Sequence, residues 1–334
     1  MNYLNIIFIF IILLILIFYY FINNPPFPID VVYTWGGEGV SLDRRTANNN
    51  ELKYSLRSLF KFAPWINHVY IYMNPPKKMP SWFNDKYVEK ITILDHKDTI
   101  LKNYLPNSNS NAIETTLSNI FGLSEHFIYF NDDMFLTNPC RWTDFYSLSG
   151  KPYVDNRIKN ISQLELTENW ESSIYPKFPD NSFKNKGYLR AWLHIPLPRL
   201  KSQMSEFQND YKEFIEWVRN TKVRTGSGCD PCKVLNLKCP CQQQHNLLGY
   251  YMYNNNKAVL KNYNKKNLCK FTFLRQLDSP SYREKLMNNL GKYLCVNDSF
   301  GKDNSTLENK YDVLHNVTLN FYEKLYPEKL FFEK

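Results

Sequence analysis

The sequence lacks the features that usually mark a nucleic-acid-binding protein. It has no run of five or more Lys and Arg residues, no RNA-binding aromatic signature and no zinc-finger helix. The net charge of +9 and the pI of about 9.0 therefore indicate either a lysine-rich solvated surface or phosphorylated small substrates such as nucleotide sugars. Hydrophobic residues make up 43% of the 334 positions, which is enough for a core and excludes general disorder. We expect no nucleic-acid partner.

Charge is absent from the first segment of the chain. Residues 3–22, YLNIIFIFIILLILIFYYFI, are almost wholly apolar. At about 1.5 Å per residue, a helix of this length spans the ~30 Å hydrocarbon core of a bilayer. No basic residue precedes the run and no small-residue cleavage site follows it, so residues 1–23 are expected to be an uncleaved signal anchor. One anchor before a soluble domain predicts a single-pass type II membrane protein, in the Golgi or another secretory-pathway lumen.

Cysteine is scarce outside one cluster. Four of the seven cysteines fall within the segment CDPCKVLNLKCPCQQQH, at Cys229, Cys232, Cys239 and Cys241. This spacing resembles a four-thiolate zinc site, but in an oxidising lumen it would equally hold two disulfides, which we slightly favour. Either arrangement would be a local staple. Four N-x-S/T sequons fit a luminal compartment, at Asn160, Asn297, Asn304 and Asn316.

Strand-like and helix-like segments alternate after a stiff proline-rich linker at residues 24–28. Strands are expected at IDVVYTW (residues 29–35), HVYIYM, KITILDH and HFIYFNDD, and helices at NELKYSLRSLFKFAP and around NAIETTLSNIF. This alternation over residues 29–150 predicts an α/β fold with an open, largely parallel sheet of the Rossmann type. In such sheets ligands bind beyond the carboxyl ends of the strands.

The second half of the chain, residues 151–334, has a looser pattern. Helices are expected at SQMSEFQNDYKEFIEWV, near QQQHNLLGYYMY and in the tail VTLNFYEKLYPEKLFFEK, with few clear strands between them. No internal repeat is present. We expect this half to be α-rich and irregular and to cover the first half, completing its site, rather than to form an independent domain.

An acidic pair follows the most strand-like run in the chain. In HFIYFNDDMFL, Asp132 and Asp133 interrupt an otherwise apolar segment. A solvated turn or a helix cap is the usual role of such a pair. Burying two unpaired carboxylates is costly, however, so a pair at the end of a core strand needs water, a cation or a substrate.

Taken together, these motifs resemble the Stealth family of sugar-1-phosphate transferases, which includes bacterial capsule phosphotransferases and the catalytic subunit of the lysosomal-enzyme N-acetylglucosamine-1-phosphotransferase. The resemblance covers residues 29–334 in four regions: IDVVYTW, the run from NELKYSLRS to LSEHFIYFNDDMFL, the segment around HIPLPRL, and YLCVNDSF with the closing LYPEKLFFEK. Two positions depart from the family pattern. The polar residue that usually follows the first strand is missing from Trp35-Gly36-Gly37-Glu38-Gly39, and Asn48 replaces a common Asp.

The resemblance implies a nucleotide-sugar fold of the GT-A-like kind and transfer of a hexose-1-phosphate from a UDP-sugar to a glycan hydroxyl, with release of UMP. A divalent cation, Mg²⁺ or Mn²⁺, would neutralise the diphosphate. Successive strand residues point to opposite faces, so we expect Asp133 to bind the cation directly while Asp132 orients a helper. The match in the third region makes His194 the candidate base for the acceptor hydroxyl.

Further residues are expected to bind the substrate. Arg45, Arg57 and Arg224 are candidate phosphate clamps, although an ion pair on a helix face is an equal alternative for Arg57. The other candidates sit in the family motifs, and those of NSNAIE could instead cap a helix; they are Trp35, Asn109, Asn111, Glu114, Asn131, Asn297 and Asp298. Two alternatives for the whole chain stay open, namely a metal-dependent glycosyltransferase that transfers the sugar alone and a degenerate, non-catalytic family member.

Overall fold

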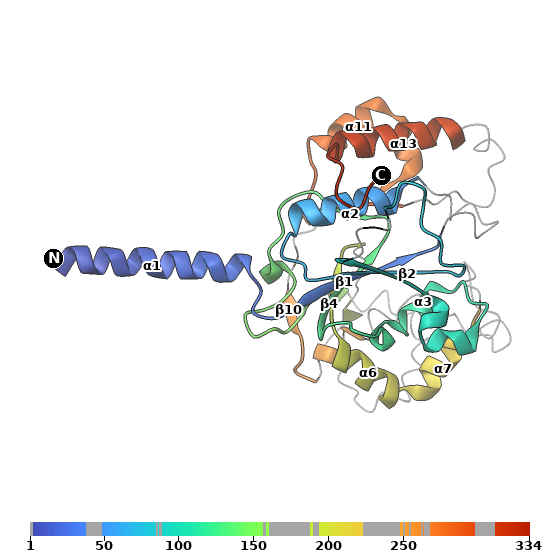
Figure 1. The fold of residues 1–334 in the computed structure, drawn as a ribbon, viewed down its shortest axis with the longest axis horizontal. Helices are drawn as coiled ribbons and strands as arrows, with labels where there is room; N and C mark the ends of the chain where they lie inside the picture. Colours follow the sequence, from blue (N-terminus) through green and yellow to red (C-terminus); the bar gives the residue numbers. More distant parts are fainter. Residues whose placement is uncertain are drawn as a thin grey trace.

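A five-stranded open sheet forms the centre of the protein (Figure 1). Its strand order is β3-β2-β1-β4-β9, and the first four strands are mutually parallel whereas β9 is antiparallel to β4. The strands are β1 (Ile29–Trp35), β2 (Val69–Met73), β3 (Ile91–Asp95), β4 (His126–Asn131) and β9 (Leu197–Leu200). This arrangement confirms the predicted α/β sheet, and it brings the ends of β1, β2, β3 and β4 to one carboxyl edge.

The computed structural model describes most of the first half of the chain and selected parts of the second. The described residues are 3–37, 49–84, 86, 89–155, 158–159, 188–189, 194–222, 248–249, 251–253, 255–261, 263, 268–297 and 311–334.

Helices cover both faces of the sheet (Figure 1). On one face, α2 (Glu51–Phe62) packs its Leu52, Leu56 and Leu59 against Val31 and Tyr33 of β1. These leucines recur at helical spacing, and the helix ends two residues before Pro64 because proline cannot continue it.

The opposite face carries three helices: α3 (Ser110–Glu114), α6 (Lys201–Asp210) and α7 (Lys212–Asn220). Val32 and Phe127 point to this side and pack in a core that includes residues of all three helices. The strand pleat therefore distributes the sheet's apolar residues between two cores.

Both helical segments on this face are more broken than the sequence pattern predicts. The segment around NAIETTLSNIF forms only α3 and a short 3₁₀ turn at Leu117–Asn119. Thr115 and Thr116 donate their hydroxyls to the carbonyls of Ala112 and Ile113, each at 2.7 Å, and such bonds compete with the helical ladder. The predicted helix SQMSEFQNDYKEFIEWV likewise divides at Tyr211 into α6 and α7.

A second sheet joins the two halves of the chain. The strand β5 (Met134–Leu136) pairs antiparallel with β12 (Tyr293–Asn297), which in turn lies parallel to β11 (Cys269–Phe273). The helices α11 (Pro280–Met287) and α13 (Tyr311–Leu325) pack over it in a third core. The residues that follow Asp132 and Asp133 are therefore held directly by a strand from the far end of the chain.

Small elements complete the described structure. The strand β6 (Tyr153–Asp155) pairs with β10 (Val259–Lys261), and β7 (Ile158–Lys159) pairs with β8 (Tyr188–Leu189). Short 3₁₀ turns occupy His96–Asp98, Ile100–Tyr104, Trp142–Asp144 and Leu274–Asp278.

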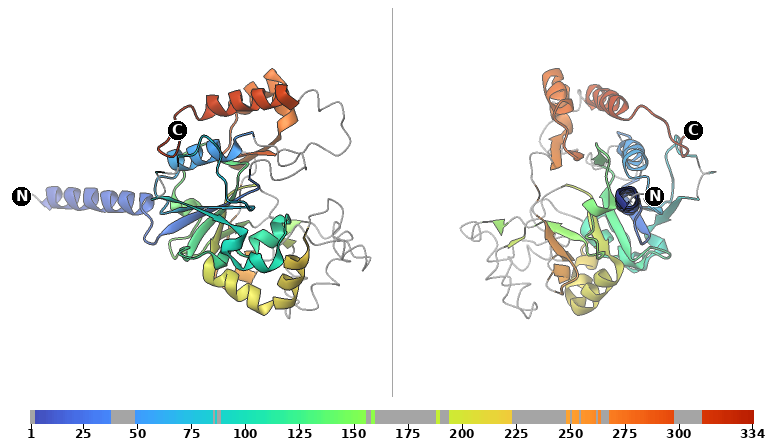
Figure 2. Two further views of the ribbon diagram at one scale, coloured as in Figure 1. Left: turned by 45° about the vertical axis from the view of Figure 1, so that its right-hand side comes forward. Right: turned by 90° about the vertical axis from the view of Figure 1, so that its left-hand side faces the viewer.

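The N-terminal helix α1 (Tyr3–Asn23) projects away from the body of the protein (Figure 2). None of its residues is buried, and by length and composition it can cross a membrane. Its last turn contacts the body, because the indole Nε1 of Trp142 donates a 2.9 Å hydrogen bond to the carbonyl of Phe21. In the linker, the ring of Phe27 stacks on His126 with 3.8 Å between centroids. The helix is thus attached where β4 begins.

Candidate active site

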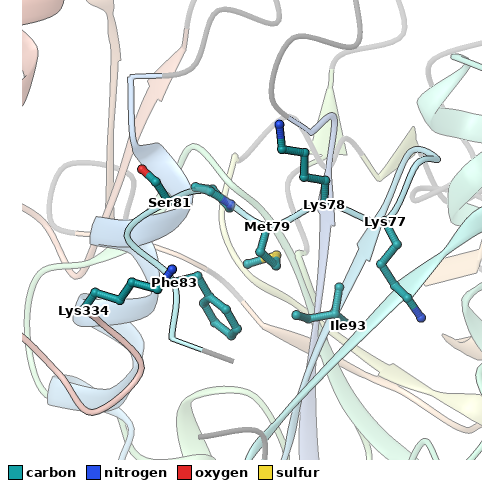
Figure 3. Close-up of a pocket in the computed structure, with 8 residues that line it drawn as sticks. Lys77, Lys78, Met79, Ser81, Phe83, Ile93 and Lys334 are labelled. Carbon is teal, nitrogen blue, oxygen red and sulfur yellow. The ribbon is translucent and has the colours of Figure 1, made fainter. Parts of the chain in front are cut away.

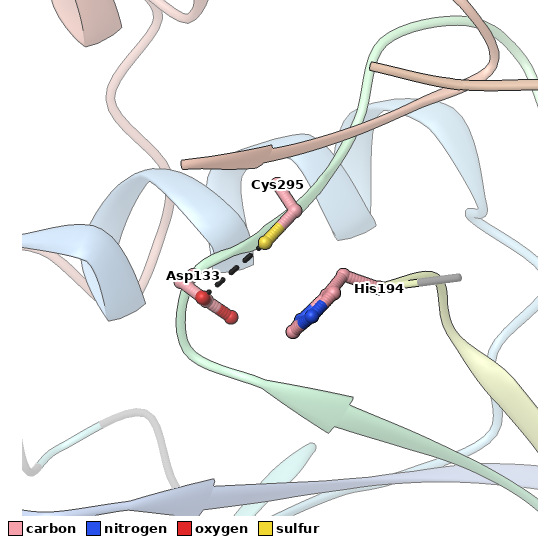
Figure 4. A group of neighbouring side chains, drawn as sticks. All are labelled: Asp133, His194 and Cys295. Carbon is pink, nitrogen blue, oxygen red and sulfur yellow. Dashed lines mark hydrogen bonds between the residues drawn. The ribbon is translucent and has the colours of Figure 1, made fainter. Parts of the chain in front are cut away.

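Asp133 lies in the turn between β4 and β5, at the carboxyl edge of the main sheet (Figure 4). The thiol of Cys295, on β12, donates to its Oδ2 at 3.3 Å, and the amide of Asn297 approaches the same oxygen at 3.5 Å. The backbone N–H of Val296 donates to the Asp133 carbonyl at 3.1 Å. The second carboxylate oxygen, Oδ1, is buried and has no hydrogen-bond partner among the residues that the structure describes.

His194 comes to the same place from a third direction. It directly precedes the segment leading into β9, and its ring lies 4.6 Å from that of Phe271. Three potential metal-ligand atoms lie within 4.8 Å of one another, one each from Asp133, His194 and Cys295 (Figure 4). The structure therefore brings together three of the predicted site residues, Asp133, His194 and Asn297, although up to 164 residues separate them.

Three carboxyl groups crowd this region and share an unfavourable environment. Burial raises the pKa of Asp132 well above its usual value, and the nearby charges of Asp133 and Glu51 raise it further. Burial also raises the pKa of Asp133, although the neighbouring His194 opposes this. For Glu51, burial raises the pKa to about 7 despite hydrogen bonds to both carboxylate oxygens from Asn49, at 2.8 and 2.7 Å.

The residues present fit a divalent cation. The buried Oδ1 of Asp133 has no partner among the described residues, and it could bind a cation. The cation would also offset the repulsion among the three carboxylates. Asp133 and Asp132 are the residues that would hold it. Hard oxygen ligands of this kind suit Mg²⁺ or Mn²⁺.

A hydrogen-bond network beside the acidic pair holds two more predicted residues. The hydroxyl of the buried Tyr129 lies 2.9 Å from the hydroxyl of Thr34. Its single hydrogen can be donated either to Glu114 Oε1, at 3.0 Å, or to Asn131 Oδ1, at 2.6 Å. The network joins β1, β4 and α3 at the carboxyl edge of the sheet. Glu114 and Asn131 are thereby fixed at the edge where a ligand is expected.

Asn109 acts as a helix cap, which was the alternative to substrate binding. Its Oδ1 accepts from the backbone N–H of Asn111 at 3.1 Å, and its Nδ2 donates to the carbonyl of Thr221 at 2.9 Å. The buried amide Nδ2 of Asn111 has no hydrogen-bond partner within the described structure. Trp35, at the end of β1, is buried in the core beneath α2.

Arg57 does not lie with the acidic cluster. Its guanidinium donates to Glu333 at 2.8 Å through Nε and again through a terminal nitrogen, and to Glu323 at 3.0 Å. It also donates to the carbonyl of Tyr326. Because these bonds turn the guanidinium toward the C-terminal tail, the structure favours the ion-pair alternative over a phosphate clamp.

Several predicted residues lie outside the described part of the chain, so their roles stay predictions. They are Arg45, Arg224, Asp298 and the cysteine cluster of Cys229, Cys232, Cys239 and Cys241.

Sequence reasoning missed Cys295 and Glu51 as members of the site. Both occur in motifs that the resemblance identified, Cys295 in YLCVNDSF and Glu51 at the start of NELKYSLRS. The signal available was the position of Cys295 two residues before Asn297, which places both on the same face of a strand.

Two concave features are formed by described residues. A cleft of about 420 Å³ near the ends of β2 and β3 contains none of the predicted site residues (Figure 3); it is lined by Lys77, Lys78, Met79, Pro80, Ser81, Phe83, Ile93 and Lys334. A much smaller cavity of about 10 Å³ lies beside Glu114, Tyr129 and Arg199. It is too small for a sugar, so the Glu114 network is closely packed on that side.

Known proteins resemble this chain over most of its length. Residues 45–154 match conserved region 2 of the Stealth proteins. The capsular polysaccharide phosphotransferase fcs1 of Haemophilus influenzae is 27% identical over 88% of this chain and 84% of its own length. The phosphotransferase LcbA of Neisseria meningitidis is 29% identical over 83% and 79%, and that of Actinobacillus suis is 32% identical over 76% and 66%. Among solved structures, the galactosyltransferase LgtC with donor and acceptor sugar analogues is 11% identical with a TM-score of 0.39, over 86% of this chain and 95% of that one.

The α/β sheet, the acidic site at its carboxyl edge and these relatives define an enzyme that transfers phosphorus-containing groups. The chain belongs to the Stealth family.

Proposed function

We propose that this enzyme transfers a hexose-1-phosphate, such as N-acetylglucosamine-1-phosphate, from a UDP-sugar to a hydroxyl of a glycan or polysaccharide and releases UMP. The observation that carries this proposal is the crowded carboxylate site around Asp133, where Oδ1 has no hydrogen-bond partner among the described residues and a diphosphate-bound cation would offset the carboxylate charges. The relatives named capsular polysaccharide phosphotransferases support the acceptor class.

The reaction replaces one phosphorus–oxygen bond by another. The acceptor oxygen attacks the phosphorus next to the sugar, and the bond from that phosphorus to the bridging oxygen breaks, so that UMP leaves with the bridging oxygen. When bound by Asp133 and Asp132, Mg²⁺ or Mn²⁺ would neutralise negative charge on the diphosphate.

His194 takes the proton of the acceptor hydroxyl in this proposal. A base must lie within reach of the reacting oxygen, and a nitrogen of His194 lies within 4.8 Å of an Asp133 carboxylate oxygen. The acceptor hydroxyl would therefore approach on the His194 side of Asp133.

The remaining polar groups at the edge of the sheet would hold the donor. We assign Glu114 and Asn131, which Tyr129 contacts, to accept hydrogen bonds from sugar or nucleotide hydroxyls, and the buried amide of Asn111 to donate one. We assign Arg45 and Arg224 to the phosphates, and Trp35 and Asp298 to the same donor site. Asn297 approaches Asp133, so its sequon should stay unglycosylated.

We assign residues 29–150 to the nucleotide-sugar-binding core and residues 151–334 to a half that completes the site. His194, Cys295 and Asn297 of the later half meet Asp133 of the earlier one, which supports this division.

The anchoring proposal rests on α1. We propose that α1 is a single membrane anchor of a type II protein and that the catalytic part lies in the Golgi or another secretory-pathway lumen. The exposed apolar surface of α1 and its contact with Trp142 support this, because a helix fixed to the body there would hold the body close to the bilayer surface.

Phosphotransfer is tested with a UDP-sugar that carries a radiolabel in the phosphate next to the sugar. The full chain is incubated with a panel of such donors, Mg²⁺ and a glycan acceptor. The proposal predicts that UMP is released and that the label appears in the product. Release of UDP with the label would instead show a glycosyltransferase, and release of no nucleotide from any donor would favour a non-catalytic family member.

A further inference from the structure

The group of Asp133, His194 and Cys295 has a donor set that magnesium does not prefer. It offers a carboxylate oxygen, an imidazole nitrogen and a sulfur within 4.8 Å of one another. Magnesium binds oxygen ligands almost exclusively, whereas zinc accepts all three donor types. Three protein ligands with one open position are typical of zinc sites that are not purely structural.

One pair in this group already has the spacing of two ligands around one ion. The sulfur of Cys295 lies 3.3 Å from Oδ2 of Asp133. With a Zn–S distance of about 2.3 Å and a Zn–O distance of about 2.0 Å, two ligands in tetrahedral geometry lie roughly 3.5 Å apart. Little movement of either side chain is therefore needed.

The three residues come from segments that are held firmly. Cys295 is buried at 0% exposure in the middle of β12, which pairs with both β5 and β11. Asp133 is tied to β12 through its backbone carbonyl, and His194 packs against Phe271 of β11. A preorganised set of ligands loses little conformational freedom when an ion binds.

We propose that Asp133, His194 and Cys295 form a zinc site that overlaps the magnesium site and through which zinc inhibits the enzyme. On binding, the Cys295 thiol loses its proton to solvent and the sulfur bonds to the ion in place of its hydrogen bond to Asp133. The same ion takes the lone pair of His194 and a carboxylate oxygen of Asp133. The proposed base and the proposed magnesium ligand are thus withdrawn together, so the inhibition part of this inference rests on the proposed function.

The binding part is tested without any enzymatic activity. The metal-free full chain is titrated with Co²⁺, whose bond to a thiolate gives a charge-transfer absorption band. Because the cysteine cluster at residues 229–241 can contribute to this band, the test is the difference between variants. Cys295→Ser, which keeps a hydrogen-bond donor to Asp133 but offers no soft ligand, should lose one thiolate's share of the band. It should also bind zinc at least ~10- to 100-fold more weakly at this site, since even outer-shell partners cost that much when removed.

Cys140→Ser is the matched control. Cys140 is also buried, but its thiol donates to the carbonyl of Asn138 and belongs to no metal-ligating group among the described residues. This variant should keep the wild-type cobalt band and zinc affinity. Cys295→Ala provides a second variant if the serine does not fold, with folding checked by circular dichroism.

Inhibition is then measured as the zinc concentration that halves each protein's own Mg²⁺-dependent UMP release. This concentration should be about 10- to 100-fold higher for Cys295→Ser than for wild type or Cys140→Ser. An unchanged cobalt band and zinc affinity in Cys295→Ser would overturn the zinc site while leaving phosphotransfer standing. Zinc binding that depends on Cys295 in a protein that releases no UMP would instead support the zinc site and reject the proposed function.

Discussion

Arg57 and Glu333 form two parallel hydrogen bonds of 2.8 Å, although 276 residues separate them. Their side chains are only 2% and 1% exposed. The pair fastens the C-terminal tail to α2, the helix that begins with Glu51 beside the acidic site. The C-terminal tail is thus joined to the helix that carries Glu51.

Breaking this pair should destabilise the protein. Among the described residues, Glu333→Gln leaves the buried guanidinium of Arg57 with the half-exposed Glu323 as its one ionic partner, and we expect a loss of about 3 kcal/mol in the free energy of unfolding. Urea denaturation measures it. The double variant Arg57→Met with Glu333→Leu, which removes both charges, is the control and should recover much of the loss. A loss of about 0.5 kcal/mol or less for Glu333→Gln would mean that the pair behaves like an exposed surface pair.

The same pair predicts a dependence on pH. Burial acts to raise the pKa of Glu333, but the hydrogen bond and charge of Arg57 outweigh it and leave the pKa below its usual value. The carboxylate therefore stabilises the fold above the unfolded-state pKa of about 4.3, and this contribution is lost as the pH falls through the folded-state pKa. The stability gap between wild type and Glu333→Gln should accordingly narrow below about pH 4. A constant gap down to acid unfolding would contradict the ion pair.

The contribution of Glu51 to stability should depend on pH in the opposite direction. Its pKa is raised to about 7, mainly by burial, so the protonated form stabilises the fold and this stability is lost as pH rises from about 4.3 toward 7. In metal-free protein, Glu51→Gln should therefore gain up to about 3 kcal/mol relative to wild type between about pH 5 and pH 8. Any change in the hydrogen bonds from Asn49 is present at both pH values and cancels. Saturating Mg²⁺ should shrink the gain, because the cation stabilises the charged carboxylate; equal gains with and without Mg²⁺ would place Glu51 outside the influence of the metal.

Variants of His194 and Asp133 should differ in the step that they impair, because His194 is assigned to the acceptor and Asp133 to the metal-bound donor. His194→Ala should lower transfer to the acceptor by roughly 10²- to 10⁴-fold, as expected for a lost general base. It should leave Mg²⁺-dependent binding of the UDP-sugar intact, which calorimetry measures. Loss of donor binding in His194→Ala would assign the residue to the donor side instead.

The orientation of the anchor is open to a direct test. With α1 in the membrane and the body in the lumen, residues from about 24 onward should resist added protease in intact microsomes and be digested only after detergent. Digestion of the catalytic part without detergent would reverse the proposed orientation.

The strands of the sheet could be predicted from the sequence because each is specified by a short, continuous run of residues. Each of β1, β2, β3 and β4 is a run of β-branched and aromatic residues bounded by turn residues, and the structure has each strand where the pattern indicated it. The acidic pair was identified for a similar reason, since two carboxylates after a core strand violate the local pattern.

The rest depends on contacts that local patterns do not encode. Cys295 meets Asp133 only because β12 pairs with β5, a register set by tertiary packing across more than 150 residues. From the sequence alone, Arg57 could equally be a phosphate clamp or a partner in an ion pair, and only the position of Glu333 decides between the two. The role of Asn109 also could not be decided from the sequence. Its cap geometry and its bond to Thr221 depend on the packing of α3 against α7.

The most direct test of the account is the binding of the UDP-sugar donor to Asp133→Asn, measured by calorimetry with and without Mg²⁺. The amide keeps the shape of the side chain but loses the charge that would hold the cation, so Mg²⁺ should no longer strengthen binding of the UDP-sugar. UMP release should fall by about 10²- to 10³-fold or more. The metal-free melting temperature should be unchanged or slightly higher, because repulsion with Asp132 is relieved. If Asp133→Asn binds the donor with the same Mg²⁺ dependence as wild type, Asp133 does not hold the metal and the acidic pair is a turn.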